Sequence, residues 1–198
     1  MLGSLQFAFY NYAFYLFGAA LNVFFLLYLA LVVLSGIALI AGLLALDVSV
    51  VGESFVPRTP VRPIAAYMFV WAAVLAAAWI VQSLVFAFTG AVPEIGEDPF
   101  RVIAALDLLF VVTPVTFGAV WLWKRRGWGF VIAIVMNVKG AMYAGMLLTA
   151  GLYWGGDDLV GLWAFFMVGS LVSLIVLMRG MHGQGAVASL SGRPAPAP

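Results

Sequence analysis

Long apolar stretches dominate the chain and alternate with short polar loops. Five of them come close to or exceed the ~20 residues that a helix needs to cross a bilayer. They cover residues 24–46, 64–88, 102–123, 129–151 and 160–178. Backbone N–H and C=O groups must be paired internally in hydrocarbon, so we expect each stretch to be helical. The pattern predicts an all-α, polytopic transmembrane bundle with five spanning helices.

The N-terminal region is too long for one spanning helix. No charged residue occurs from Leu5 to Leu46, and a single helix over this range would be about 63 Å long, twice the apolar thickness of a bilayer. Gly18 and Asn22 are turn-type residues, so we expect a break at 18–22. Residues 5–17 then form a partial or sixth helix, whose many aromatic side chains are typical of the membrane interface.

Composition excludes several classes of protein. The chain is 66% hydrophobic and 9% charged, with a mean hydropathy of +1.15, whereas soluble domains carry about 25% charged residues. It contains no cysteine, which removes disulfides and thiol nucleophiles, and its single histidine is His182. We therefore expect neither a metal site nor a haem or other cofactor. A net charge of +1 gives no reason to expect a nucleic-acid partner.

Basic residues predict the orientation. Loops 47–63 and 124–128 and the C-terminal region hold seven basic residues, against one, Arg101, in loops 89–101 and 152–159. The positive-inside rule places the seven in the cytoplasm, together with the C-terminus. We expect residues 1–180 to form a transmembrane domain in a prokaryotic cytoplasmic (inner) membrane. Residues 181–198, which end in GRPAPAP, are expected to be a disordered cytoplasmic tail.

Lys139 interrupts the apolar stretch 129–151 near its middle, about 15 Å from the cytoplasmic end. A lysine at the bilayer midplane costs about 3 kcal/mol on insertion scales, so we expect it to face the interior of the bundle. Met136 and Tyr143 share its helix face, and Asn137 lies roughly opposite. The adjacent Gly140 allows a neighbouring helix to pack closely.

Asp107 is the other charged residue within a spanning stretch, about 8 Å from the outer surface. Its side chain leans outward while that of Lys139 leans inward, which strains a direct ion pair. Gln82 lies at the depth of Asp107, so we expect Gln82 to be its nearest polar partner on another helix. For Lys139 we expect Thr113 or the carbonyl of Phe110, which loses its helical donor because Pro114 has no N–H.

Two explanations of these residues remain open. Lys139, Asp107, Gln82, Thr113, Tyr143 and Asn137 are candidates for a binding or translocation site. Alternatively, Lys139 only holds helices together through hydrogen bonds, and Asp107 bonds Gln82 or water. A retinal-type Schiff base on Lys139 is not favoured, because the sequence predicts neither seven helices nor a charged counter-ion at the depth of the lysine.

The loops offer less chemistry. Residues 123–129, WKRRGWG, are typical of anchoring at anionic headgroups, with a specific lipid site as the alternative. Asp157 and Asp158 follow two glycines, which favours a turn over a metal site. No enzyme motif is present, so we expect no catalytic activity.

One region is similar to a known group. Residues 106–140 contain Asp107-Leu108, Pro114, Leu122-Trp123, the basic residues 124–126, Trp128-Gly129 and Lys139-Gly140. This pattern resembles a signature of uncharacterised bacterial and archaeal multi-pass membrane proteins, for which no activity is established. Residues 14–31 also resemble that group, although its members usually carry proline where this chain has Val23. The resemblance implies a multi-pass membrane protein and no specific function.

The function that these patterns favour is binding or translocation of a small solute or ion through the helix bundle. The alternative is a non-catalytic accessory or scaffold subunit of a membrane complex. In either case the lipid bilayer is the expected partner, and the scaffold would add another membrane protein or a second copy of this chain. A midplane lysine favours the first function, whereas the scarcity of polar groups within the spans favours the second.

Overall fold

The computed structural model describes residues 1–19, 21–155 and 158–181, and its regular elements in these ranges are helices. Five are long and apolar enough to cross a membrane. They are α2 (Phe25–Leu44), α4 (Val61–Thr89), the continuous unit α5–η1–α6 (Glu97–Trp123), α7 (Gly127–Trp154) and α8 (Val160–Gly180). The predicted all-α bundle with five spanning helices is confirmed, and its composition indicates a membrane-embedded protein.

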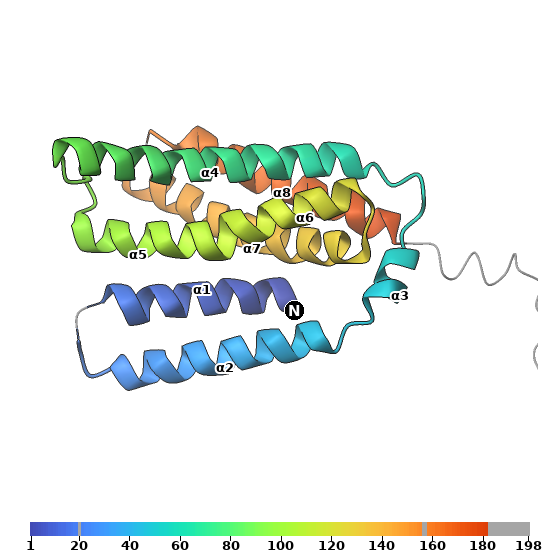
Figure 1. Ribbon diagram of the computed structural model, residues 1–198, viewed down its shortest axis with the longest axis horizontal. Coiled ribbons are helices and arrows are strands. Elements are labelled where there is room, and N and C mark those ends of the chain that lie inside the picture. The colour runs from blue at the N-terminus through green and yellow to red at the C-terminus, as the bar shows by residue number, and fades with distance from the viewer. Residues whose placement is uncertain (20, 156–157, 182–198) are drawn as a thin grey trace, which may run out of the picture.

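An additional helix, α1, precedes the five (Leu2–Gly18). The predicted break is confirmed, because α1 ends at Gly18 and α2 begins at Phe25. Its 17 residues span about 26 Å, slightly less than the apolar thickness of a bilayer. Figure 1 shows α1 antiparallel to α2, between α2 and the other helices. The expectation of interfacial aromatic side chains fails for Tyr10, which is 2% exposed, because α1 packs along α7.

Helix α7 is the central element. It packs against α1, α6, α8 and the short helix α3 (Val48–Glu53). The carboxylate of Asp47 caps α3 by accepting hydrogen bonds from the backbone N–H groups of Ser49 and Val50. The Ser49 hydroxyl, with these amides, lowers the pKa of the Asp47 carboxyl. The most buried apolar side chains of the bundle include Ala65, Met68, Val115, Ala119, Leu122, Ala133 and Leu177.

The unit α5–η1–α6 contains a local irregularity that the sequence analysis did not predict. Between α5 (Glu97–Asp107) and α6 (Thr113–Trp123), residues Leu108–Val112 form the π-helical turn η1. The Thr113 N–H donates to the carbonyl of Leu108, five residues earlier. Pro114 follows directly and has no N–H, so the regular α-helical ladder could not continue through this position.

The two ends of the bundle differ in charge. One end, called the basic end, carries the acids Asp47 and Glu53 and six cations: Arg58, Arg62, Lys124, Arg125, Arg126 and Arg179. The other, called the acidic end, carries Glu94, Glu97, Asp98 and Asp158. In the described part of the chain the ion pair within 4.0 Å is Arg101–Asp98, an exposed contact of 3.0 Å at the acidic end. The predicted disordered tail lies outside the described residues from 182 onward, as does Asp157.

Cysteine labelling tests the predicted orientation. Val56 at the basic end and Val92 at the acidic end are 38% and 58% exposed, and the chain has no native cysteine. In intact cells we expect Val92→Cys to react with a membrane-impermeant maleimide and Val56→Cys to react only after permeabilisation. The opposite labelling pattern would place the basic end outside and contradict the prediction.

Candidate functional site

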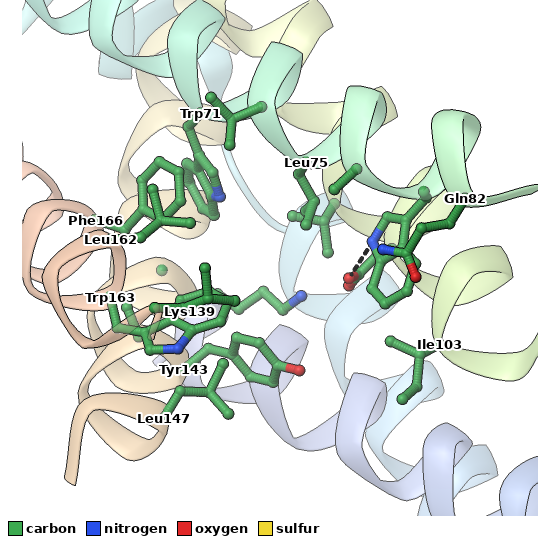
Figure 2. A pocket seen from close by; sticks show the side chains of 18 of the residues that line it. Trp71, Leu75, Gln82, Ile103, Lys139, Tyr143, Leu147, Leu162, Trp163 and Phe166 are labelled. Atoms are coloured by element: carbon green, nitrogen blue, oxygen red, sulfur yellow. Dashed lines mark hydrogen bonds between the residues drawn. The ribbon is translucent and has the colours of Figure 1, made fainter. Parts of the chain in front are cut away.

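A cavity of about 550 Å³ lies between α4, α5, α7 and α8. Ile95 and Leu159, which line one side of it, belong to the acidic-end loops, so the cavity extends from the middle of the bundle toward that end. Figure 2 shows a wall that is mostly apolar and aromatic. The labelled apolar and aromatic side chains include Trp71, Leu75, Ile103, Leu147, Leu162, Trp163 and Phe166. The cavity also contains the polar side chains of Gln82, Asp107, Lys139 and Tyr143.

Lys139 enters this cavity from the middle of α7. It is 2% exposed, which confirms that it faces the bundle interior. Its Nζ lies 3.6 Å from the centroid of the Tyr10 ring and 5.4 Å from that of Tyr143. In Figure 2 the Lys139 amine and the Tyr143 hydroxyl point in the same direction. Aromatic faces attract a desolvated ammonium by about 2 kcal/mol.

The Lys139 ammonium makes no hydrogen bond with any residue in the described ranges. Asp107, the carboxylate that also lines the cavity, lies more than 4.0 Å from the Lys139 ammonium. The ion pair found within that distance in the described part of the chain is Arg101–Asp98. The expectation that a direct Asp107–Lys139 contact would be avoided is therefore confirmed. An ammonium has three N–H donors, and none of them is used in a hydrogen bond to a described residue.

Both oxygens of the Asp107 carboxylate are occupied. Asp107 is 3% exposed. The Tyr10 hydroxyl donates to Oδ1 at 2.5 Å, and the Trp79 indole N–H donates to Oδ2 at 2.8 Å, the dashed line of Figure 2. Hydrogen bonds to an ionised acceptor are the strong class, so these two donors offset part of the cost of burying the carboxylate.

Tyr10 connects the acid and the amine. Its hydroxyl bonds Asp107, and the face of its ring lies against the Lys139 ammonium. The ring also makes an edge-to-face contact with Tyr143, at 5.7 Å between centroids. One phenol from α1 thus separates a positive and a negative group that come from two other helices.

Two further contacts hold α1 in the position that this arrangement requires. The Gln6 amide donates from Nε2 to the carbonyl of Phe110 at 2.9 Å. On the α7 side, Gly3 lies so close to Val138 that any side chain at position 3 would overlap it. Position 3 therefore requires glycine, and α1 is fixed against both α7 and the η1 turn.

The prediction that Gln82 is the partner of Asp107 is wrong. Asp107 accepts hydrogen bonds from Trp79 and Tyr10, whereas Gln82 is exposed and lines the cavity. The reason is depth. The helix that carries Asp107 begins at Glu97, not at residue 102, so Asp107 lies ten residues inside its acidic-end terminus. On α4, which ends at Thr89, the residue at matching depth is Trp79, one turn deeper than Gln82.

The predicted partners of Lys139 are also wrong. Thr113 is exposed, and its hydroxyl donates to the carbonyl of Leu108 at 2.8 Å within its own helix. The Phe110 carbonyl does accept a side-chain hydrogen bond near Pro114, but the donor is Gln6. The Lys139 ammonium lies against the aromatic rings of Tyr10 and Tyr143 instead.

Asn137 and Gly140 have structural positions around the site. Asn137 is fully buried but does not line the cavity. Its Nδ2 donates to the carbonyl of Ala133 at 2.7 Å, while its Oδ1 has no hydrogen-bond partner. A side chain at Gly140 would meet Ser170 Oγ at 2.7 Å and the Trp71 ring at 2.8 Å. The predicted close packing at Gly140 is confirmed, with α8 and α4 as the neighbours.

Sequence reasoning did not find Tyr10 or Trp79. Tyr10 is one of many aromatic residues in a helix without charge, and Trp79 is one of seven tryptophans in a chain where this residue usually marks the interface. A usable signal did exist for Trp79. It precedes Gln82 by three residues and therefore shares its helix face.

The chain was compared with protein-family models, curated proteins and solved structures, and no match was found in any of the three. The resemblance to a group of prokaryotic membrane proteins thus stays a prediction.

The site combines a hydrogen-bond donor group with an apolar enclosure. Lys139 offers N–H donors, Tyr143 and Gln82 add polar atoms, and Asp107 balances the charge of the lysine. Within the described residues no group of three or more His, Asp or Glu side chains could hold a metal ion. This geometry is suited to binding an apolar molecule that carries one hydrogen-bond acceptor.

Proposed function

We propose that the chain binds a largely apolar small molecule with a carbonyl oxygen at one end, and that Lys139 is the residue that binds this oxygen. One observation carries the proposal. The Lys139 ammonium faces a cavity of about 550 Å³ and makes no hydrogen bond to any described residue. A charge-assisted hydrogen bond contributes about 1.5–3 kcal/mol, so a ligand oxygen here would offset a large part of the cost of burying the lysine.

The shape and lining of the cavity favour an apolar body for this ligand. Its volume lies within the 300–1,000 Å³ typical of small-molecule sites. Three of its side chains are the indoles of Trp71, Trp79 and Trp163, and most of the others are aliphatic. A polar solute would lose its hydration against these walls without compensation.

Charge balance favours a neutral carbonyl over a carboxylate. Lys139 and Asp107 together carry no net charge, and their side chains are only 2% and 3% exposed. A ligand carboxylate would bring a second negative charge into this apolar volume without a second cation, which is costly. A ketone, quinone or ester oxygen accepts a hydrogen bond without that cost.

Binding is better supported than passage across the bundle. On the basic-end side of Lys139, α7 continues with Met136, Ala133 and Phe130, each at most 2% exposed. These side chains fill the bundle where a path would have to continue. Translocation would require them to separate, whereas binding from the acidic end requires no such movement.

Replacing Lys139 tests the function. The probe is decylubiquinone, a quinone with an apolar tail, and binding is followed by quenching of tryptophan fluorescence in the purified protein. We expect Lys139→Met to raise the Kd by about 10- to 100-fold, because one charge-assisted hydrogen bond is lost. Arg126→Met, which removes an exposed cation far from the cavity, is the matched control and should leave the Kd unchanged.

Two results would contradict the proposal. The first is an equal Kd for wild type and Lys139→Met, in a variant whose helical content and monodispersity show that it is folded. That result would favour the scaffold alternative, in which Lys139 only holds helices together. The second is an equally strong, Lys139-independent affinity for decylbenzene, which has the apolar tail but no oxygen.

A further inference from the structure

A second cavity, of about 460 Å³, lies at the basic end of the bundle. It forms where the loop before α4 meets the turn between α6 and α7. Its lining consists of residues 58–63 and 123–125. None of these residues lines the Lys139 cavity, so the inference drawn from it is independent of the proposed function.

The basic-end cavity concentrates positive charge. Four of its nine lining residues are cations: Arg58, Arg62, Lys124 and Arg125. No carboxylate of the described chain lies within 4.0 Å of any of them, since the ion pair found in those ranges is Arg101–Asp98 at the other end. Four cations without an anion repel one another. An anion bound between them would relieve this repulsion.

Specific contacts hold two of the cations in place. Arg125 Nη2 donates to the carbonyl of Thr59 at 2.6 Å, and the Arg62 guanidinium lies 6.0 Å from the centre of the Trp123 ring. A guanidinium has five N–H donors, so each arginine keeps several for a ligand. Thr59 is itself 4% exposed and packs against Gly180 of α8 so closely that a side chain at 180 would overlap it.

The backbone at this site is unusual in two ways. Arg125 has φ 52°, in the left-handed region, which costs a non-glycine residue on the order of 1 kcal/mol. This conformation accompanies the Arg125–Thr59 contact. In addition, α4 begins at Val61 after Pro60 without a side-chain cap. The Val61 N–H donates to the carbonyl of Thr59 at 2.8 Å and Pro63 has no N–H, so the first turn offers the Arg62 N–H and the positive end of the helix dipole to the same cavity.

We infer that the basic-end cavity binds the phosphate group of an acidic phospholipid. Arginine guanidinium groups match the oxygen geometry of a phosphate, and the N-terminus of α4 adds the positive end of its helix dipole. A lipid is favoured over a soluble phosphate because the cavity lies at the ends of two spanning helices, α4 and α6. Trp123 in its wall is 47% exposed, as expected of a residue at the membrane–water interface.

Native mass spectrometry of the full chain in a neutral detergent tests the inference. We compare phosphatidylglycerol with phosphatidylcholine of the same acyl chains. The wild type should retain phosphatidylglycerol at least 10-fold more strongly than phosphatidylcholine. The double variant Arg62→Gln/Lys124→Gln should lose this preference. The matched control Arg126→Gln/Arg179→Gln, which removes two cations outside the cavity, should keep it.

A second variant covers the case in which the double variant does not fold. Arg58→Gln changes one exposed cation of the cavity that has no side-chain hydrogen bond or ion pair with a described residue, and it should weaken retention of phosphatidylglycerol at least 3-fold. Equal retention by wild type, Arg58→Gln and the matched control would overturn the site, because general surface charge would then explain the preference. If millimolar inorganic phosphate displaces phosphatidylglycerol from the wild type, the assignment to a lipid is overturned in favour of a soluble phosphate.

Discussion

Replacing Asp107 by alanine should lower the free energy of unfolding by about 2–5 kcal/mol, among the largest effects we expect for one side chain. The change leaves the Tyr10 hydroxyl and the Trp79 indole N–H without their acceptor. A buried donor without a partner costs about 1–3 kcal/mol. Lys139 also loses the negative charge that balances it. Unfolding in mixed micelles with increasing denaturing detergent, followed by circular dichroism, measures the loss.

Related variants separate the network from a general effect of the substitution. Asp107→Asn keeps one acceptor oxygen and should fall between wild type and Asp107→Ala. Glu94→Ala removes an exposed carboxylate at the acidic end and should change stability by less than about 0.5 kcal/mol. Tyr10→Phe combined with Asp107→Ala should cost less than the sum of the two single changes, because they share one hydrogen bond. Strict additivity would contradict the Tyr10–Asp107 contact.

Gly129→Ala should have the second large effect, a loss of about 3 kcal/mol or more, at the upper end of what overpacking costs. Gly129 lies in the first turn of α7, against the last turn of α6. A Cβ at this position would overlap the backbone of Trp121 and Leu122. Backbone atoms cannot rotate away as a side chain can, so the two helices would have to separate. The same unfolding measurement applies.

Gly161→Ala is the matched control for this change. Gly161 lies in the first turn of α8, and a Cβ there meets no atom within 4 Å. Alanine forms helix more readily than glycine, so this variant should be neutral or up to about 1 kcal/mol more stable. A Gly129→Ala protein as stable as Gly161→Ala would mean that the α6–α7 hairpin can widen without cost.

The spanning helices could be predicted from the sequence because the bilayer imposes a simple requirement on each of them. A spanning segment must be long and apolar, and this property is local. The break after Gly18 was predictable for the same reason, since an uninterrupted helix over the uncharged stretch from Leu5 to Leu46 would be too long for the apolar layer. Lys139 could be placed inside the bundle from the cost of exposing its charge to lipid.

The partners within the site were not predictable in the same way. Hydropathy located the start of the Asp107 helix at residue 102, but Glu97 and Asp98 already belong to its first turn, where acidic residues are favourable. This error of five residues led to Gln82 instead of Trp79. Tyr10 lies 97 residues from Asp107 in the chain, and helices that are apolar on all sides do not reveal which face meets which neighbour.

The position of α1 has a consequence for how the protein is made. Gln6 and Tyr10 enter the membrane with α1, but their partners at Phe110 and Asp107 are synthesised 104 and 97 residues later. At about 5–20 residues per second, a ribosome needs about 5–20 s to produce that length of chain. During this time α1 must hold an amide and a phenol in the bilayer without their final acceptors. The packing of α1 is therefore completed only after α5 and η1 have been synthesised, although α1 leaves the ribosome before them.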